Sequence, residues 1–474
     1  MTFTTPTFFL FLAITLVLYF VLNRHYRYQN LLLLAAGYVS YGLWDWRFLI
    51  LLIATTIINF FMGGAIAKSF NPSNKNIYLG IALVWTLLVL GVFKYFDFFS
   101  GSVSNLLSLL NFHLDPVLLK ILLPLGISFY SFQSLTYPFD IYRGKMTPDK
   151  INLFDFALFV SFFPIIISGP IERATHLLPQ ICTARKISLD NLKIGITLII
   201  WGYFQKLVIA DNLAPIVNQV FDNYAKFNGL DIVIAVLAYT IQIYCDFSGY
   251  IDIARGIAKL LGFDIVLNFN LPYIAINPSD FWARWNISLS SWFRDYLYIP
   301  LGGNRKGAVR TGLNLVATMT LVGLWHGAAW TFILWGFYHG VLLVIYRIIN
   351  SGKKTAQAIK TAKLYSIIPK ALLMFVLVAS GWAIFRSTSL TQVAYIFTHM
   401  NLTTSDNTGE FAGKLLYLTV PVIAFYAIKI GVGNVALKVA NMNPWVLGII
   451  CGIILALVII FWPREIPRFI YQGF

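Results

Sequence analysis

Long apolar runs are the feature that most constrains what this chain can fold into. A helix needs about 20 mostly apolar residues to cross the ~30 Å hydrocarbon core of a bilayer. Only 11% of the residues are charged, against about 25% in soluble domains. The runs therefore predict an all-α, polytopic integral membrane protein with roughly a dozen transmembrane helices. They lie near residues 7–22, 31–44, 47–66, 77–99, 118–136, 194–210, 231–252, 313–330, 332–349, 369–386, 414–431 and 445–462.

Two further segments are predicted not to cross the membrane. The run 154–168 has basic residues on both flanks, so a single crossing would violate the positive-inside rule, and a re-entrant segment is expected. Residues 278–300 are predicted to form an amphipathic helix at the interface or dipping inward. The run 7–22 lacks a basic n-region and a small-residue cleavage site, so it is interpreted as a retained first span.

The formal net charge of +16 comes from basic residues in short segments between the apolar runs. This pattern is typical of cytoplasmic loops, with some attraction to anionic membrane lipid. No basic domain or binding motif is present, so nucleic acid is not an expected partner. The three cysteines are widely spaced and predict neither a disulfide framework nor a zinc site. Both termini of the chain are predicted to lie outside the cytoplasm. The loops predicted to be cytoplasmic are 24–27, 68–75, 143–150, 173–193, 305–310 and 353–363.

The stretch 278–339 carries the strongest functional signal. Asn277 is a favourable N-cap and Pro278 a favourable first helical residue. From there, apolar and polar side chains separate onto two faces of one predicted helix. Asn286 falls within the apolar face. Because a buried amide needs hydrogen-bond partners, we expect Asn286 to face a polar group.

His326 lies near the far end of the apolar run 313–330. At 1.5 Å per residue, it would lie on the order of 20 Å deep. An ionisable group inside a membrane segment is by default a functional hypothesis, and the alternative is a histidine bonded to a helix carbonyl. His339 stands in a similar Tyr-His-Gly context. It is interpreted as structural, because more than three helical turns would separate it from His326.

This stretch resembles the signature of the membrane-bound O-acyltransferase family. It is most similar to the bacterial branch that acetylates alginate, peptidoglycan and other exported polysaccharides. The chain is interpreted as one such domain, residues 1–474, with a signature core at about 120–345. The same resemblance extends through LPLGISFYSFQSLTYPFDIYRG (123–144), SGPIERATHLLPQI (168–181), FQKLVIADNLA (204–214) and QIYCDFSGYIDIARGIAKLLGF (242–263).

The resemblance implies that the histidine of the LWHG motif, here His326, is catalytic. The fitting chemistry is general base catalysis, in which the imidazole takes a proton from an acceptor hydroxyl that attacks a thioester. The bacterial branch usually has a second histidine where this chain has Asn286. Many relatives acting on proteins and lipids use an Asn/His pair. Asn286 is therefore expected either to assist catalysis, as amide donors do in oxyanion holes, or to cap a polar cavity.

The family also implies a ring of tilted helices around a central tunnel, in the inner (cytoplasmic) membrane of a bacterium. A cytosolic acyl donor, expected to be acetyl-CoA, would enter from one side, and no resident cofactor is implied. The acceptor would be an exported polysaccharide on the other side. The implied protein partner is an extracytoplasmic, esterase-like O-acetyltransferase of the SGNH type.

Three charged residues are candidate substrate-binding groups. Arg284 and Arg294 could hold phosphate groups of a bulky donor, or could anchor their helix to lipid head groups. Asp246 could line a polar tunnel, although structural pairing is an equal alternative. Asp252 can pair with Arg255, three residues further on.

The chain ends PREIPRFIYQGF, which holds Phe469, Tyr471 and Phe474 in an F-x-Y-x-x-F pattern. The pattern is similar to the terminal motif of small partner peptides in D-alanylation relatives, where the tyrosine accepts the acyl group. We hypothesise that Tyr471 takes the acyl group with His326 as base. The alternative is an aromatic anchor at the membrane interface.

Other functions stay open at this point. One is D-alanyl transfer from a carrier protein to teichoic acid. A second is a non-enzymatic transporter or flippase, which would favour inverted repeats, and no such pairing is found. A third is a catalytically inactive scaffold, which the asparagine at 286 permits. The absence of a P-loop and of a Rossmann fingerprint argues against ATP or NAD chemistry.

Overall fold

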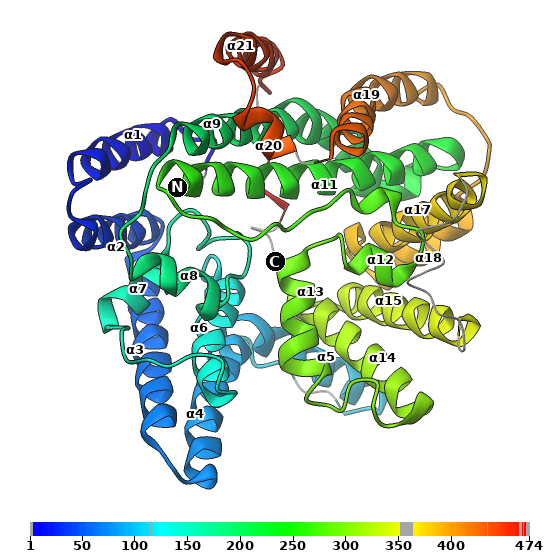
Figure 1. Ribbon diagram of the computed structural model, residues 1–474. Coiled ribbons are helices and arrows are strands. Elements are labelled where there is room, and N and C mark those ends of the chain that lie inside the picture. Colours follow the sequence, from blue (N-terminus) through cyan, green and yellow to red (C-terminus); the bar gives the residue numbers. More distant parts are fainter. Residues whose placement is uncertain are drawn as a thin grey trace. The chain divides into compact units, whose positions relative to one another are not determined.

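The computed structural model describes residues 3–112, 115–350, 364–433, 435–463, 467 and 469–470, and every regular element in that part of the chain is a helix (Figure 1). These residues divide into two compact units. Unit 1 comprises Met1–Ile200 and Tyr250–Val266, and unit 2 comprises Trp201–Gly249 and Leu267–Phe474. Helix α11 (Gly229–Leu260) contributes to both units. The single-domain organisation and the central tunnel stay predictions.

Unit 1 is built mainly from the first half of the chain. Within it, α3 packs against α4, α6 and α7, and α2 packs against α7 (Figure 1). Its elements are α1 (Pro6–Val21), α2 (Tyr26–Gly42), α3 (Trp46–Lys68), α4 (Pro72–Leu90), the π-helix η1 (Gly91–Tyr95), α5 (Phe96–Leu109), α6 (Ile127–Tyr142), α7 (Leu153–Ser161), α8 (Ala174–Ile181) and most of α9 (Leu189–Tyr203).

Unit 2 holds the stretch 278–339, and its most extensive helix pair is α14 with α15. Its elements are the π-helix η2 (Phe204–Ala210), α10 (Asp211–Phe221), η3 (Tyr224–Lys226), most of α11, η4 (Pro272–Ile274), α12 (Pro278–Trp282), α13 (Ile287–Phe293), the π-helix η5 (Arg294–Tyr298), α14 (Gly307–His326), α15 (Trp330–Ile349), α17 (Leu364–Arg386), α18 (Leu390–His399), α19 (Thr408–Val432), α20 (Val435–Ala440) and α21 (Pro444–Ile460).

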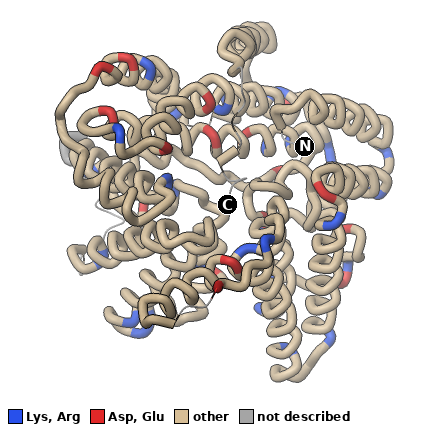
Figure 2. Tube along the Cα trace, turned by 180° about the vertical axis from the view of Figure 1, so that it is seen from behind, with Lys and Arg blue, Asp and Glu red and all other residues tan. Residues whose placement is uncertain are grey.

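The described residues contain eight helical segments that are long and apolar enough to cross a membrane, and the polytopic all-α prediction is confirmed. The helices α1 and α21 are apolar but shorter, so the predicted dozen is an approximate count. Charged residues are sparse and fall largely at helix ends and connecting segments (Figure 2). The eight segments are Trp46–Lys68, Pro72–Leu109, Leu189–Phe221, Gly229–Leu260, Gly307–His326, Trp330–Ile349, Ile367–Arg386 and Thr408–Val432.

The predicted span 118–136 is wrong in its position. The helix α6 begins only at Ile127, because Gly126 before it has a left-handed φ of +69°. A Cβ at Gly126 would lie 2.4 Å from the carbonyl oxygen of Ile166, so the close approach also requires glycine. Almost all of α6 is buried, and it forms part of the core of unit 1.

The predicted re-entrant segment 154–168 contains one short helix. Asn152 caps α7, its side chain accepting a 2.9 Å hydrogen bond from the Asp155 N–H. The helix has nine residues, about 14 Å at 1.5 Å per residue, so α7 alone is too short to cross the ~30 Å hydrocarbon core. Its depth in the bilayer stays a prediction.

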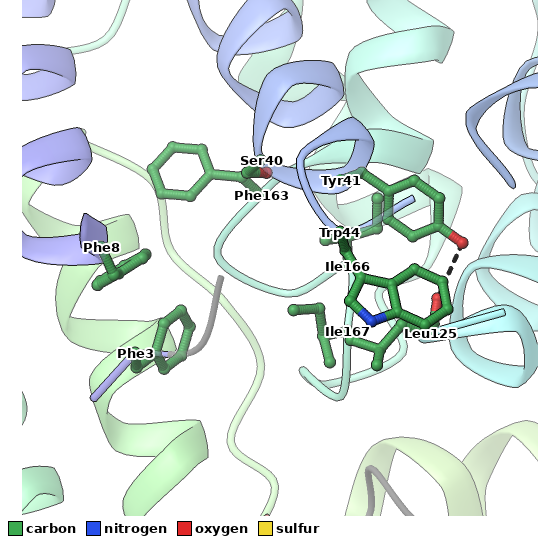
Figure 3. Close-up of a pocket in the computed structure, with 9 residues that line it drawn as sticks. All are labelled: Phe3, Phe8, Ser40, Tyr41, Trp44, Leu125, Phe163, Ile166 and Ile167. Atoms are coloured by element: carbon green, nitrogen blue, oxygen red, sulfur yellow. Dashed lines mark hydrogen bonds between the residues drawn. The ribbon is translucent and has the colours of Figure 1, made fainter. Parts of the chain in front are cut away.

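Unit 1 also contains a mainly apolar pocket (Figure 3). The Tyr41 hydroxyl at its edge donates a 3.0 Å hydrogen bond to the carbonyl of Leu125. The side chains that line it include no His, Cys, Asp, Glu, Lys or Arg, and Tyr41 is the one ionisable residue among them. The residues that line it are Phe3, Phe8, Ser40, Tyr41, Trp44, Leu125, Phe163, Ile166 and Ile167.

Candidate active site

The helices α14 and α15 form a hairpin whose backbones touch (Figure 1). A Cβ at Gly323 would lie 2.1 Å from the carbonyl oxygen of Phe332, and one at Gly336 would lie 2.2 Å from that of Met319. Only glycine permits such close approach. The helix α14 ends at His326, so the backbone that carries this imidazole is held firmly against the next helix.

His326 is buried, with 2% of its surface exposed. Its ring lies among aromatic rings, with centroid distances of 4.9 Å to Trp325, 5.1 Å to Trp335 and 5.4 Å to Phe385. His326 is therefore buried inside unit 2, while its depth in the bilayer and its catalytic role stay predictions. Its imidazole is a group that can act as a general base.

Asn286 interrupts the helix that the sequence predicts over 278–300. Its backbone is left-handed, with φ 42° and ψ 55°, and it separates α12 from α13. The prediction of one continuous helix is therefore wrong. The reason is local, because asparagine tolerates the left-handed region better than most residues, and a helical wheel assumes an unbroken helix.

One residue, Asn268, holds the turn around Asn286. The Asn268 side-chain amide donates to Asn286 Oδ1 at 3.1 Å. The Asn268 carbonyl accepts from the Ile287 N–H at 3.0 Å, and Asn268 Oδ1 accepts from the Ser288 N–H at 2.9 Å. The prediction that Asn286 is buried against a polar group is confirmed, since 1% of its surface is exposed.

Aromatic rings connect the neighbourhood of Asn286 to that of His326. Trp285 lies 4.7 Å from Trp382, Trp382 lies 5.7 Å from Trp335, and Trp335 lies 5.1 Å from His326, all between ring centroids. The Asn286 side chain makes no hydrogen bond to His326, since its Oδ1 bonds Asn268 and its Nδ2 has no partner among the described residues. The structure thus brings the two predicted catalytic residues into one aromatic cluster without direct contact.

Several buried polar atoms in this cluster have no hydrogen-bond partner within the described part of the chain. They are Asn286 Nδ2, the indole N–H groups of Trp285 and Trp335, and both ring nitrogens of His339. Buried polar groups are normally paired, and exceptions mark ordered water, an ion or a ligand. Apart from the His339 nitrogens, these atoms are hydrogen-bond donors, so the cluster favours a ligand with acceptor oxygens such as a carbonyl.

His339 is fully buried and packs against the same tryptophan, Trp335. Its ring lies 4.9 Å from Trp335 and 5.2 Å from Trp282. A Cβ at Gly381 would lie 2.8 Å from His339 Nε2, so glycine leaves the space beside this nitrogen. The interpretation of His339 as a packing residue stays a prediction, because the two unpartnered nitrogens leave room for a polar role.

The candidate substrate-binding arginines lie on α12, η5 and the turns around them. Arg284 Nε is 2.7 Å from Asp280 Oδ1, and its Nη1 donates to the Asn270 carbonyl at 3.2 Å. Arg294 pairs with Asp295 at 2.8 Å, with 62% of its side chain exposed. Arg284 is thus fixed within its turn and Arg294 is accessible, while phosphate binding by either stays a prediction.

Asp246 belongs to a buried ion cluster that the sequence did not reveal. Lys206 Nζ lies 2.7 Å from both Asp211 Oδ1 and Asp246 Oδ1. The signal available in the sequence was a single lysine inside the apolar run 194–210, followed by an aspartate. In unit 1, the predicted Asp252–Arg255 pair is confirmed at 3.5 Å. Tyr471 lies outside the described residues, and its acyl-carrying role stays a prediction.

These features define an all-helical, polytopic membrane protein with a buried histidine in an aromatic cluster. A family model described as "MBOAT, membrane-bound O-acyltransferase family" matches residues 141–387. The matched region includes Asn286, His326 and His339. The chain therefore belongs to the membrane-bound O-acyltransferase family and is an acyltransferase, which removes the transporter alternative.

Curated relatives from bacteria extend the match to most of the chain. It is 42% identical to "Probable alginate O-acetylase AlgI" of Azotobacter vinelandii, over 89% of this chain and 83% of the relative. It is 34% identical to "Peptidoglycan O-acetyltransferase" of Helicobacter pylori, over 82% and 77%. A further relative is "Teichoic acid D-alanyltransferase" of Bacillus subtilis, 30% identical over 55% of this chain and 68% of the relative.

Proposed function

We propose that this protein transfers acetyl groups from cytosolic acetyl-CoA across a bacterial inner membrane for the O-acetylation of an exported polysaccharide. The observation that carries the proposal is the buried His326 imidazole at the end of α14, enclosed by Trp325, Trp335 and Phe385. The relatives named for alginate and peptidoglycan O-acetylation support the choice of acetyl group and glycan.

In the proposed reaction, a His326 ring nitrogen takes the proton of an acceptor hydroxyl. The hydroxyl oxygen attacks the thioester carbonyl, the carbon–sulfur bond breaks, and the imidazolium returns the proton to the leaving thiolate. Asn286 Nδ2 and the neighbouring indole N–H groups are donors that can stabilise the negative charge on the carbonyl oxygen. Arg294, which is exposed, and Arg284 are the candidates for the donor's phosphate groups.

The acceptor hydroxyl is proposed to be that of Tyr471. The tyrosyl ester would then pass its acetyl group to an extracytoplasmic transferase of the esterase-like SGNH type, and from there to the glycan. The F-x-Y-x-x-F pattern at the end of the chain supports this order of events. The change Tyr471→Phe keeps the ring and removes only the hydroxyl, so glycan acetylation should fall to background. Undiminished acetylation would make Tyr471 an interfacial anchor.

The function is tested by mass spectrometry of glycan isolated from cells with and without the gene, and from cells carrying His326→Ala. We expect O-acetyl groups with the unchanged gene and at most a trace with His326→Ala, since a general base contributes roughly 10²- to 10⁴-fold to the rate. His25→Ala is the matched control, because His25 is exposed before α2. D-alanyl esters in place of acetyl groups, or normal acetylation in His326→Ala, would overturn the proposal.

A further inference from the structure

Unit 2 contains a buried cluster of three charged side chains. Lys206 belongs to the π-helix η2, Asp211 begins α10, and Asp246 lies on α11. All three are buried, with 6%, 4% and 1% of their surfaces exposed. The lysine lies 2.7 Å from a carboxylate oxygen of each aspartate. Ionisable groups buried in a membrane protein are costly and mark functional sites more often than packing.

The cluster carries more negative than positive charge, and this leaves carboxylate oxygens available as acceptors. Lys206 contacts Oδ1 of each aspartate. Asp211 Oδ2 is buried without a hydrogen-bond partner in the described ranges. Hydrogen bonds from an amide N–H to an ionised carboxylate are roughly twice as strong as those between neutral groups. The ammonium of Lys206 gives both carboxylates a partner of opposite charge in this apolar setting.

The carboxy-terminal tail needs such acceptors. Beyond α21, Pro463 and Pro467 have no N–H and cannot continue a helix. A backbone N–H that has no helical partner in the interior of a membrane protein must find another acceptor.

Two described residues near the chain end contact α11, and one of them contacts the cluster directly. The Ile470 N–H donates a 2.8 Å hydrogen bond to Asp246 Oδ2. The Phe469 ring is buried and lies 6.0 Å from the ring of Phe247, between centroids. Two consecutive residues of the tail thus meet two consecutive residues of α11, one through a polar contact and the other through an apolar contact.

We propose that the Lys206–Asp211–Asp246 cluster is a docking site for this chain's own carboxy-terminal tail. Asp246 is the residue that receives the tail, and Lys206, itself paired with Asp211, fixes the orientation of its carboxylate by contacting Oδ1. Asp246 is thereby a positioning residue for position 471, which follows the docked Ile470. Docking stands on the contacts of Phe469 and Ile470 alone, and only its effect on acetylation rests on the proposed function.

The test is the release of the last six residues from the full-length protein in detergent micelles. Trypsin cleaves after Arg468 and frees the peptide FIYQGF, which mass spectrometry quantifies over time. Asp246→Asn should speed this release at least ten-fold, because the amide is a weaker acceptor and no longer pairs with Lys206. This variant leaves a neutral Lys206–Asp211 pair, so folding is retained, and a thermal unfolding curve checks it.

Asp252→Asn is the matched control, since Asp252 lies on the same helix and pairs with Arg255 at 3.5 Å. It should release the peptide at the wild-type rate. Equal release from the wild type and Asp246→Asn, or equal acceleration in both variants, would overturn the docking site. If Asp246→Asn releases the tail faster while Tyr471→Phe acetylates normally, docking stands and the tyrosine relay fails. If both the docking site and the tyrosine relay are correct, Asp246→Asn should release the tail faster and also lose glycan acetylation.

Discussion

Two buried polar regions of unit 2 differ in how their polar atoms find partners. In the Lys206 cluster, each charged group lies 2.7 Å from a group of opposite charge. In the aromatic cluster around His326, Asn286 Nδ2 and the indole N–H groups of Trp285 and Trp335 have no partner among the described residues. The first region pairs each charge with an opposite one and leaves only an acceptor, Asp211 Oδ2, without a partner in the described residues. The second keeps donors available, which is what a site for a carbonyl substrate requires.

The comparison predicts that the ion cluster controls stability and the aromatic cluster controls turnover. Changes in the first should move the unfolding temperature, and changes in the second should move the rate of acyl transfer. A variant in one cluster that changes both the unfolding temperature and the transfer rate, or only the quantity assigned to the other cluster, would contradict this distinction.

The largest effect on stability is expected for Lys206→Met. It leaves two carboxylates buried without their counter-ion, and breaking a buried ion pair in this way costs about 3–5 kcal/mol. Thermal unfolding of the purified full-length protein measures it. The triple variant with Asp211→Asn and Asp246→Asn removes all three charges and should recover much of the loss. An unchanged unfolding temperature in Lys206→Met would show that the lysine does not stabilise the fold.

Asn286→Leu is expected to lower acyl transfer by roughly 10²-fold, the low end for loss of an amide donor at an oxyanion. Leucine also strains the left-handed backbone at this position. Asn286→Gly is therefore the control, because glycine adopts φ 42° freely. Rates of glycan acetylation should fall equally in both variants. Full activity in the glycine variant would assign Asn286 to the backbone turn alone.

Gly323→Ala is expected to destabilise the protein by about 1–3 kcal/mol, as overpacking does in a well-packed core. The new methyl group would lie 2.1 Å from the carbonyl oxygen of Phe332 and would push α14 from α15. Gly452→Ala in α21 is the control, because nothing lies within 4 Å of its Cβ position and alanine favours helix. The stability of the Gly452→Ala variant should equal or exceed that of the wild type. Equal unfolding temperatures in the two variants would contradict the close packing.

The smallest effect concerns a pair outside the membrane-spanning helices. Glu172 accepts a 2.7 Å hydrogen bond from His176 Nδ1 and raises the pKa of that imidazole. A raised folded-state pKa stabilises the fold fully below the unfolded value of about 6.5, and the gain is lost as pH rises through the folded value.

With 40% of the His176 side chain exposed, the contribution should stay below about 1 kcal/mol. The unfolding temperature of the wild type should therefore fall slightly, relative to His176→Gln, between pH 6 and pH 9. If the unfolding temperatures of the two proteins change with pH in parallel, the Glu172–His176 pair does not stabilise the fold.

The sequence was sufficient for the helical class and the polar contact of Asn286, because hydropathy and local pattern determine these. It could not predict the break at Asn286, since a helical wheel treats a left-handed residue as helical. It also missed Lys206 as the partner of Asp246. That pairing joins two helices that are far apart in the sequence. In the sequence alone, a lysine in an apolar run has the same pattern whether it contacts a lipid head group or a buried carboxylate.

The glycine contacts between α14 and α15 have a consequence for the lipid setting. Helices that meet through side chains can slide or tilt as bilayer thickness changes. Here backbone meets backbone at Gly323 and Gly336, so one helix cannot slip past the other without a clash. The hairpin must respond to a thinner or thicker membrane as one rigid piece. The position of His326 relative to the rings on α15 is thereby insulated from lipid composition.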